Sequence, residues 1–222
     1  MDASGWASQS RIVIDGWVLP ESPAQTFSAG RQANVPVLLG STANEGHLLF
    51  PVNEQLSRAD FDTYVSNTFG ELGNQVTAAY ADELAISPGL AQREIATDLF
   101  MAYGMRDWAG YMRRQNVSTY LYMMEHVPPA FQIYLVDEPA LDLPDGPRSA
   151  GAYHSGDLVY VFNNLDRFAV DWTAEDRKIA DAMTGYWTEF AKTGNPNRAD
   201  LPTWPLYGLQ QHQTLRTVSY TH

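Results

Sequence analysis

Six residues without a polar side chain, VPVLLG at 35–40, limit the folds open to this chain. A run rich in β-branched residues and leucine, without polar alternation, predicts a strand buried on both faces of a sheet. A second run, STYLYMMEHVPP at 118–129, is rich in aromatic residues and is stopped by two prolines. QTLRTVSYT at 213–221 is a candidate closing strand. The segment at 11–23 predicts a short strand or hairpin that turns at its Asp-Gly pair.

Helix signals lie between these strand-like runs. Ser57 is expected to cap a helix with one apolar face. Ser87 opens either one long helix or a pair of helices, with a candidate interruption near Gly104, and Thr173 caps a helix that ends at Gly194. Strands that alternate with helices predict an α/β fold with a mixed or parallel sheet.

Composition agrees with a folded chain and excludes several functions. Hydrophobic residues make up 45% of the chain, and neither a repeat nor a linker divides residues 1–222. The formal charge of −12 argues against a nucleic-acid partner, because such binding begins with the neutralisation of phosphates. The sequence has no cysteine, which excludes disulfides, thiolate zinc sites and a cysteine nucleophile within this chain.

Signals for a membrane, a leader or a metal are not found in the sequence. No apolar run approaches the roughly 18 residues of a membrane span. The first residues lack the basic and apolar regions of a signal peptide. The stretch MEHVPP lacks the i, i+4 histidine pair of a zinc helix, so we expect neither a metal nor a cofactor. The compartment stays unknown.

Two polar residues with chemical potential lie on loops that follow strand-like runs. Glu45 comes just after the 35–40 run, and His154 lies in GAYHSGDLVYVF at 151–162, before an apolar, strand-like stretch. Strand ends in open α/β sheets deliver side chains to a crevice. An acid followed by a histidine forms the last two members of the order Ser…Asp/Glu…His. Spacing alone leaves two ordinary interpretations open, a solvated turn carboxylate and a loop histidine beside a buried segment.

The surrounding words make the interpretation specific. VPVLLGSTANEG, GAYHSGDLVYVFNNL and GYWTEFAKTGNPN…WPLY resemble the C-terminal half of the type B carboxylesterase family, which includes cholinesterases and bacterial para-nitrobenzyl esterases. The resemblance runs in register from about Val13 to Tyr207. It implies the C-terminal portion of an α/β-hydrolase fold, with an incomplete sheet and flanking helices.

The resemblance also implies roles for individual residues. Glu45 matches the triad acid of the family word DEG, which reads NEG here because Asn44 stands in place of the aspartate. His154 matches the triad histidine, and Asp157 matches an acidic position three residues later, where we expect a loop or capping carboxylate. Ordinary surface or packing roles are expected for the other histidines, His47, His126, His212 and His222.

The nucleophile that the resemblance implies is not in this sequence. No serine has glycine at both −2 and +2, and the nearest look-alike, PRSAG at Ser149, follows the acid instead of preceding it. We therefore expect part of an esterase, either a fragment or one chain of a nicked or split enzyme. It would supply Glu45 and His154, and its partner would be an N-terminal segment with the G-x-S-x-G serine and the oxyanion hole.

The expected substrate is a small-molecule ester, hydrolysed through an acyl-serine intermediate. This chain by itself is expected to hydrolyse no ester, because it holds neither the serine nor the oxyanion donors. The alternative is a non-catalytic, cholinesterase-like binding protein, since one fold can carry adhesion surfaces without chemistry. The residue at the position of the upstream serine distinguishes the two.

Overall fold

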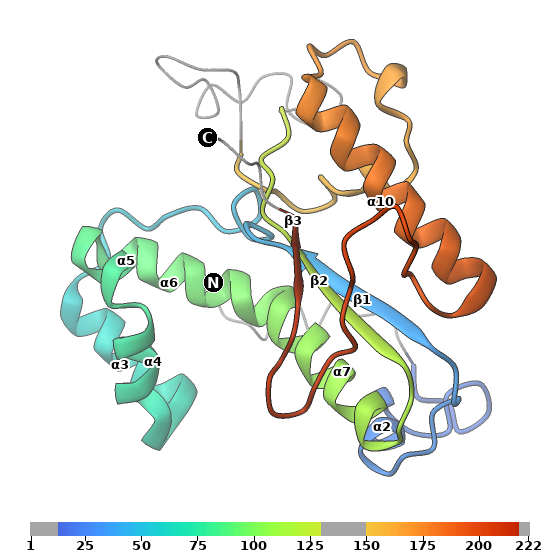
Figure 1. Cartoon of the computed structure of the whole chain (residues 1–222). Helices are drawn as coiled ribbons and strands as arrows, with labels where there is room; N and C mark the ends of the chain where they lie inside the picture. The colour runs from blue at the N-terminus through green and yellow to red at the C-terminus, as the bar shows by residue number, and fades with distance from the viewer. Residues whose placement is uncertain (1–12, 130–149, 218–222) are drawn as a thin grey trace.

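A computed structural model describes residues 13–129 and 150–217, and three parallel strands form a sheet in this part of the chain (Figure 1). The first two strands pair in register from Val37 opposite Thr119 onward. The three predicted strands and the parallel arrangement are confirmed. The strands lie in the order β1 (Val37–Thr42), β2 (Thr119–Met124) and β3 (Leu215–Thr217).

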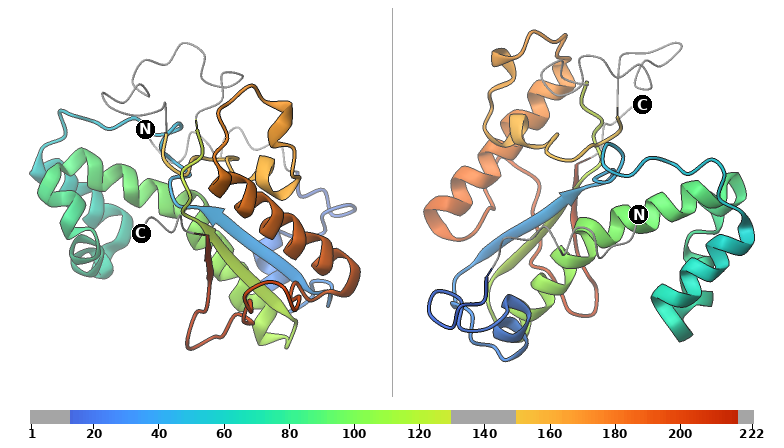
Figure 2. Two further views of the ribbon diagram at one scale, coloured as in Figure 1. Left: turned by 45° about the horizontal axis from the view of Figure 1, so that its top comes forward. Right: turned by 180° about the vertical axis from the view of Figure 1, so that it is seen from behind.

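Helices cover both faces of this sheet (Figures 1 and 2). On one face, Leu39 and Leu121 pack against Ala109 of α7. On the other face, Tyr120 packs with Tyr186 of α10. Neighbouring residues of a strand point to opposite faces, so both faces of β2 are apolar, as the unbroken runs predict. The two covering helices are α7 (Tyr103–Arg114) and α10 (Ala174–Thr193).

The aromatic ring of Tyr122 lies directly against Gly40 of the neighbouring strand. A Cβ atom at Gly40 would come within 2.1 Å of the Tyr122 ring, so the last residue of the predicted strand run has to be glycine. The same ring meets Trp187 of α10 edge to face, with centroids 5.0 Å apart. Tyr122 is thereby held at the end of β2 that approaches the loops described below.

The chain between β1 and β2 is mostly helical. Ser57 and Ser87 cap α3 and α6 through their side-chain oxygens, as predicted. The interruption predicted near Gly104 is confirmed just before that residue: a π-helical turn at residues 98–102 separates α6 from α7, and Gly104 lies in the first turn of α7 with open space around it. The elements are α3 (Arg58–Phe69), η1 (Gly70–Leu72), α4 (Gly73–Ala79), α5 (Ala81–Ile86), α6 (Pro88–Thr97) and η2 (Asp98–Ala102).

The predicted last helix is confirmed, whereas the strand-like stretch before it is not a strand. Thr173 and Asp176 form a capping box at the start of α10, and Gly194 ends the helix in the left-handed conformation. Residues 158–162 were expected to be extended, but they begin with a helical turn because the Asp157 carbonyl accepts hydrogen bonds from two following amides. The short elements here are α9 (Leu158–Val161) and η4 (Leu165–Arg167).

The hairpin predicted at 11–23 is also wrong for the part of it that is described. Residues 13–22 contain no strand, and the chain then enters α2 (Pro23–Ser28). One oxygen of Asp15 accepts hydrogen bonds from the backbone amides of Trp17 and the next two residues, so a side chain takes the place of a strand partner. The turn was correctly predicted, and the strands on each side of it were not.

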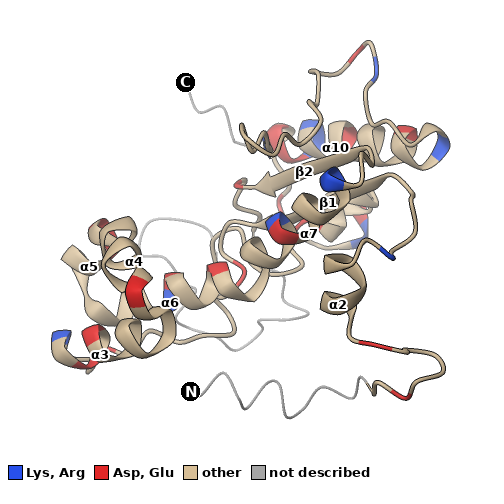
Figure 3. Cartoon of the chain, turned by 90° about the horizontal axis from the view of Figure 1, so that it is seen from below, with Lys and Arg blue, Asp and Glu red and all other residues tan. Residues whose placement is uncertain are grey.

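Acidic and basic residues are interspersed along the helices. Both kinds occur along α3, α6, α7 and α10 (Figure 3). Of the helices in this part of the chain, none has both the length and the apolar character that crossing a membrane would need.

Candidate active site

Glu45 lies three residues beyond the end of β1, and its side chain is buried. The residue is only 4% exposed, so it is not the solvated turn carboxylate of the ordinary interpretation. Its Oε1 atom accepts a hydrogen bond of 2.7 Å from the backbone amide of Thr42, the last residue of the strand. This bond orients the carboxylate and leaves Oε2 for a second partner.

That second partner is His154. The Nδ1 atom of its ring lies 2.6 Å from Glu45 Oε2, although 109 residues separate the two in the sequence. The His154 side chain is 42% exposed, and its Nε2 atom makes no hydrogen bond within residues 13–129 and 150–217. A buried carboxylate therefore lies against one ring nitrogen, while the described residues give the other nitrogen no hydrogen-bond partner.

Asn44 joins the acid loop to the histidine loop. It forms a parallel bridge with Tyr153, and its backbone amide donates to the Ala152 carbonyl at 2.9 Å. Its side-chain Oδ1 atom accepts from the Ala152 amide, also at 2.9 Å. The sequence marked Asn44 only as a departure from the family word, and it offered no sign of this contact.

The other end of the histidine loop is attached to β2. The Tyr122 hydroxyl donates a hydrogen bond of 2.7 Å to Asp157 Oδ2. Burial, and then the adjacent Asp157 carboxylate, raise the pKa of Tyr122 far above its usual range, so the hydroxyl keeps its proton and acts as the donor. Asp157 is thus a carboxylate of the histidine loop, which was one of the two roles expected for it. It does not cap α9 through its side chain, and its described partner is Tyr122 rather than His154.

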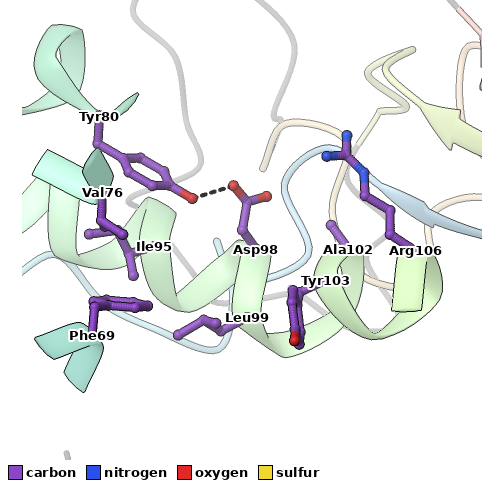
Figure 4. A pocket seen from close by; sticks show the side chains of 9 residues that line it. All are labelled: Phe69, Val76, Tyr80, Ile95, Asp98, Leu99, Ala102, Tyr103 and Arg106. Carbon is purple, nitrogen blue, oxygen red and sulfur yellow. Dashed lines mark hydrogen bonds between the residues drawn. The ribbon is translucent and has the colours of Figure 1, made fainter. Parts of the chain in front are cut away.

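The π-helical turn η2 supplies an aromatic wall beside the histidine. The Phe100 ring meets the His154 ring edge to face with centroids 5.5 Å apart, and Phe50 packs against Phe100 in turn. Wide helical turns of this kind often occur at functional sites. Leu99, the neighbouring residue, lines a separate cavity of about 250 Å³ between α3, α4, α6 and α7, where the Tyr80 hydroxyl donates to Asp98 (Figure 4).

His126 was expected to have an ordinary packing role, and the structure places it in a buried polar cluster. Its Nε2 atom lies 2.7 Å from Asp176 Oδ1, and the Tyr160 hydroxyl donates to the same oxygen at 2.7 Å. Burial alone would raise the pKa of Asp176, but hydrogen bonds from Thr173, His126 and Tyr160 outweigh it and hold that pKa below its usual range. The cluster ties the end of β2 to the start of α10.

Of the remaining described histidines, one makes a half-buried polar contact and the other lies on the surface. His47 is half-buried, and its Nε2 atom lies 3.0 Å from Glu94 Oε1, while the exposed His212 contacts the Tyr207 hydroxyl. His222 and Ser149 lie outside the described residues. Within the described ranges no group of three or more histidine, aspartate or glutamate side chains is arranged to hold a metal ion.

Comparison with solved structures places this geometry in a known fold. One solved PNB esterase superposes with a TM-score of 0.66 at 23% identity, over 91% of this chain and 38% of that chain. A parallel sheet with helices on both faces, superposed on that esterase, defines the described residues as part of an α/β-hydrolase fold.

Sequence comparison then identifies the family. The description "Carboxylesterase family" belongs to a family model that matches residues 5–221, so the chain belongs to the carboxylesterase family. It is 29% identical over 208 residues to para-nitrobenzyl esterase of Bacillus subtilis (strain 168), over 91% of this chain and 38% of that relative. It is 27% identical over 217 residues to bile salt-activated lipase of Homo sapiens, over 88% of this chain and 27% of the lipase. The expected family is confirmed, and the chain spans well under half the length of these relatives.

Proposed function

We propose that Glu45 and His154 are the acid and the base of a Ser-Glu-His triad that hydrolyses carboxylic esters. The observation that carries this proposal is the 2.6 Å contact between His154 Nδ1 and the buried Glu45 carboxylate, in a histidine whose side chain is 42% exposed. That is the arrangement in which a carboxylate fixes the ring tautomer and stabilises the imidazolium while the other nitrogen serves a nucleophile.

The proposed chemistry assigns each proton to an atom. His154 Nε2 takes the serine hydroxyl proton as the serine oxygen attacks the ester carbonyl, and it returns that proton to the departing alcohol, which leaves an acyl-serine. In the second half His154 takes a proton from water, whose oxygen attacks the acyl carbonyl, and it gives the proton back to the serine oxygen. Glu45 stays ionised throughout and stabilises the imidazolium in both halves.

The serine and the oxyanion-hole amides are proposed to come from an N-terminal segment beyond these 222 residues, in the same chain or in a separate one. Two facts support this assignment. No serine of this sequence lies in a G-x-S-x-G elbow, and the match covers only 38% of the Bacillus esterase. The proposed substrates are small-molecule esters, in keeping with the family. The well-formed Glu45–His154 contact favours hydrolysis over a non-catalytic binding role.

The test compares three preparations on a short-chain chromogenic ester. Residues 1–222 alone should show no turnover above buffer, whereas the protein completed with its G-x-S-x-G segment should be active. In the completed protein, His154→Ala should lower kcat by at least about 10³-fold with little change in KM.

His212→Ala is the matched control, because it removes an exposed histidine that contacts Tyr207, away from this pair. It should retain turnover. Near-normal turnover by His154→Ala, or His154-dependent turnover by residues 1–222 alone, would refute the proposal.

A further inference from the structure

The side chain of Asn44 lies at the junction of three parts of the site. Its oxygen accepts from the Ala152 amide at 2.9 Å, two residues before the proposed base. Its neighbour in the chain is Glu45, and its nitrogen Nδ2 lies 3.1 Å from His47 Nε2. Together with the backbone hydrogen bond to the Ala152 carbonyl, this makes the bridge across which Glu45 and His154 meet.

The histidine loop is shaped to receive this amide. Gly151 has φ +72°, and a Cβ atom built on it would lie 2.4 Å from Asn44 Oδ1. The loop backbone can therefore approach Asn44 only because residue 151 has no side chain. The approach fixes which end of the amide faces the loop, because the Ala152 amide requires an acceptor.

A polar chain continues from Asn44 to helix α6. His47 Nε2 lies 3.0 Å from Glu94 Oε1, and the Arg93 guanidinium donates to the same oxygen through two nitrogens. Burial raises the pKa of Glu94, but hydrogen bonds from His47 and Arg93 outweigh this and hold it below the usual range, so Glu94 is ionised. Glu94 and Arg93 are the charged groups that meet His47 from α6, and Glu45 lies next to Asn44 on its own loop.

We propose that Asn44 is a positioning residue that clamps the histidine loop onto the acid loop through its side-chain oxygen. The inference rests on the proposed triad. Without that oxygen the Ala152 amide loses its acceptor, and the loop that carries His154 loses a hydrogen bond to the loop that carries Glu45.

The experiment uses two substitutions in the completed protein. Asn44→Ala should lower kcat by roughly 10- to 100-fold, with KM little changed, because the proposed base is misplaced rather than removed. Asn44→Asp keeps an oxygen acceptor for the Ala152 amide, so it should keep most of the wild-type rate.

Asn53→Ala is the matched control, since it makes the same chemical change at an exposed loop asparagine that contacts Gln55, and its kcat should equal that of the wild type. A merely structural role for Asn44 would lower the amount of folded protein and leave kcat per active site unchanged. Wild-type kcat in Asn44→Ala, or a loss in Asn44→Asp as large as in Asn44→Ala, would each overturn the proposal.

Amide hydrogen exchange separates this inference from the proposed function. Exchange at the Ala152 amide should be faster in Asn44→Ala than in the wild type, and it should stay close to the wild-type rate in Asn44→Asp, which keeps an oxygen acceptor. Unchanged exchange in Asn44→Ala would overturn the clamp even in an active esterase. A faster rate in a protein that hydrolyses no ester would support the clamp and refute the proposed function.

Discussion

Replacement of Glu45 by glutamine would remove one charge at the proposed site while it keeps the shape of the side chain. The Thr42 amide needs an acceptor at 2.7 Å, so the glutamine oxygen takes the place of Oε1. The glutamine NH₂ group then faces His154 Nδ1, where the native carboxylate accepts at 2.6 Å. Nδ1 is forced to accept a hydrogen bond, so the ring proton moves to Nε2, the atom that has to act as the base.

The size of the effect follows from the geometry. Opposite charges about 4 Å apart interact by about 4 kcal/mol at an effective dielectric constant of about 20. His154 is 42% exposed, so solvent screens part of this, and we take about 3 kcal/mol for the lost stabilisation of the imidazolium. The wrong tautomer adds the cost of one disrupted hydrogen bond, about 1 kcal/mol. The sum of about 4 kcal/mol corresponds to a decrease in kcat of about 10³-fold.

The assay is steady-state ester hydrolysis by the completed protein, together with nitrogen NMR of the labelled histidine ring. We expect kcat to fall about 10³-fold while KM changes little, and the ring proton of neutral His154 to move from Nδ1 to Nε2. Glu54→Gln, which neutralises an exposed acid nearby in the sequence, is the matched control. A Glu45→Gln variant with less than a tenfold loss, or with the proton still on Nδ1, would show that Glu45 does not orient the base.

Two further predictions concern the framework of the site. Asp176→Ala should lower the free energy of unfolding by about 3–5 kcal/mol, measured by urea titration, because a helix cap is lost and buried His126 and Tyr160 lose a shared acceptor. Folding lowers the pKa of Asp176, so the ionised carboxylate contributes to stability above about pH 4 and this contribution is lost as the pH falls through the lowered pKa. The free energies of unfolding of the variant and the wild type should therefore converge in acid. Gly151→Ala should lower the free energy of unfolding by about 1–3 kcal/mol through backbone strain, and it should displace Asn44. The displacement should appear as faster hydrogen exchange at the Ala152 amide and as slower ester hydrolysis. Wild-type values of both would contradict the close approach of residue 151 to Asn44.

Features that depend on a few neighbouring residues were predictable from the sequence. Ser57, Ser87 and Thr173 were each expected to cap a helix, and each does, because a capping hydrogen bond links residues only three apart. The unbroken apolar runs correctly indicated strands covered on both faces. Such signals are local, so they survive without knowledge of the rest of the fold.

Short apolar stretches were not predictable in the same way. Residues 158–162 have no period that distinguishes a strand from a helical turn. Packing decided their conformation, since Val159 and Tyr160 bury themselves against residues of α10 in one core cluster. At 13–22 the carboxylate of Asp15 took the hydrogen bonds that a hairpin would have needed.

For the candidate site, the sequence by itself determined the family and the two residue types, because the words around Glu45 and His154 carry a recognisable order. It could not show that the two side chains meet across 109 residues, that Glu45 is buried, or that Asn44 is hydrogen-bonded to the histidine loop. Those features depend on the register of β1 against β2 and on the bridge from Asn44 to Tyr153. Contacts between distant loops leave no local period in a sequence, so only the tertiary structure decided them.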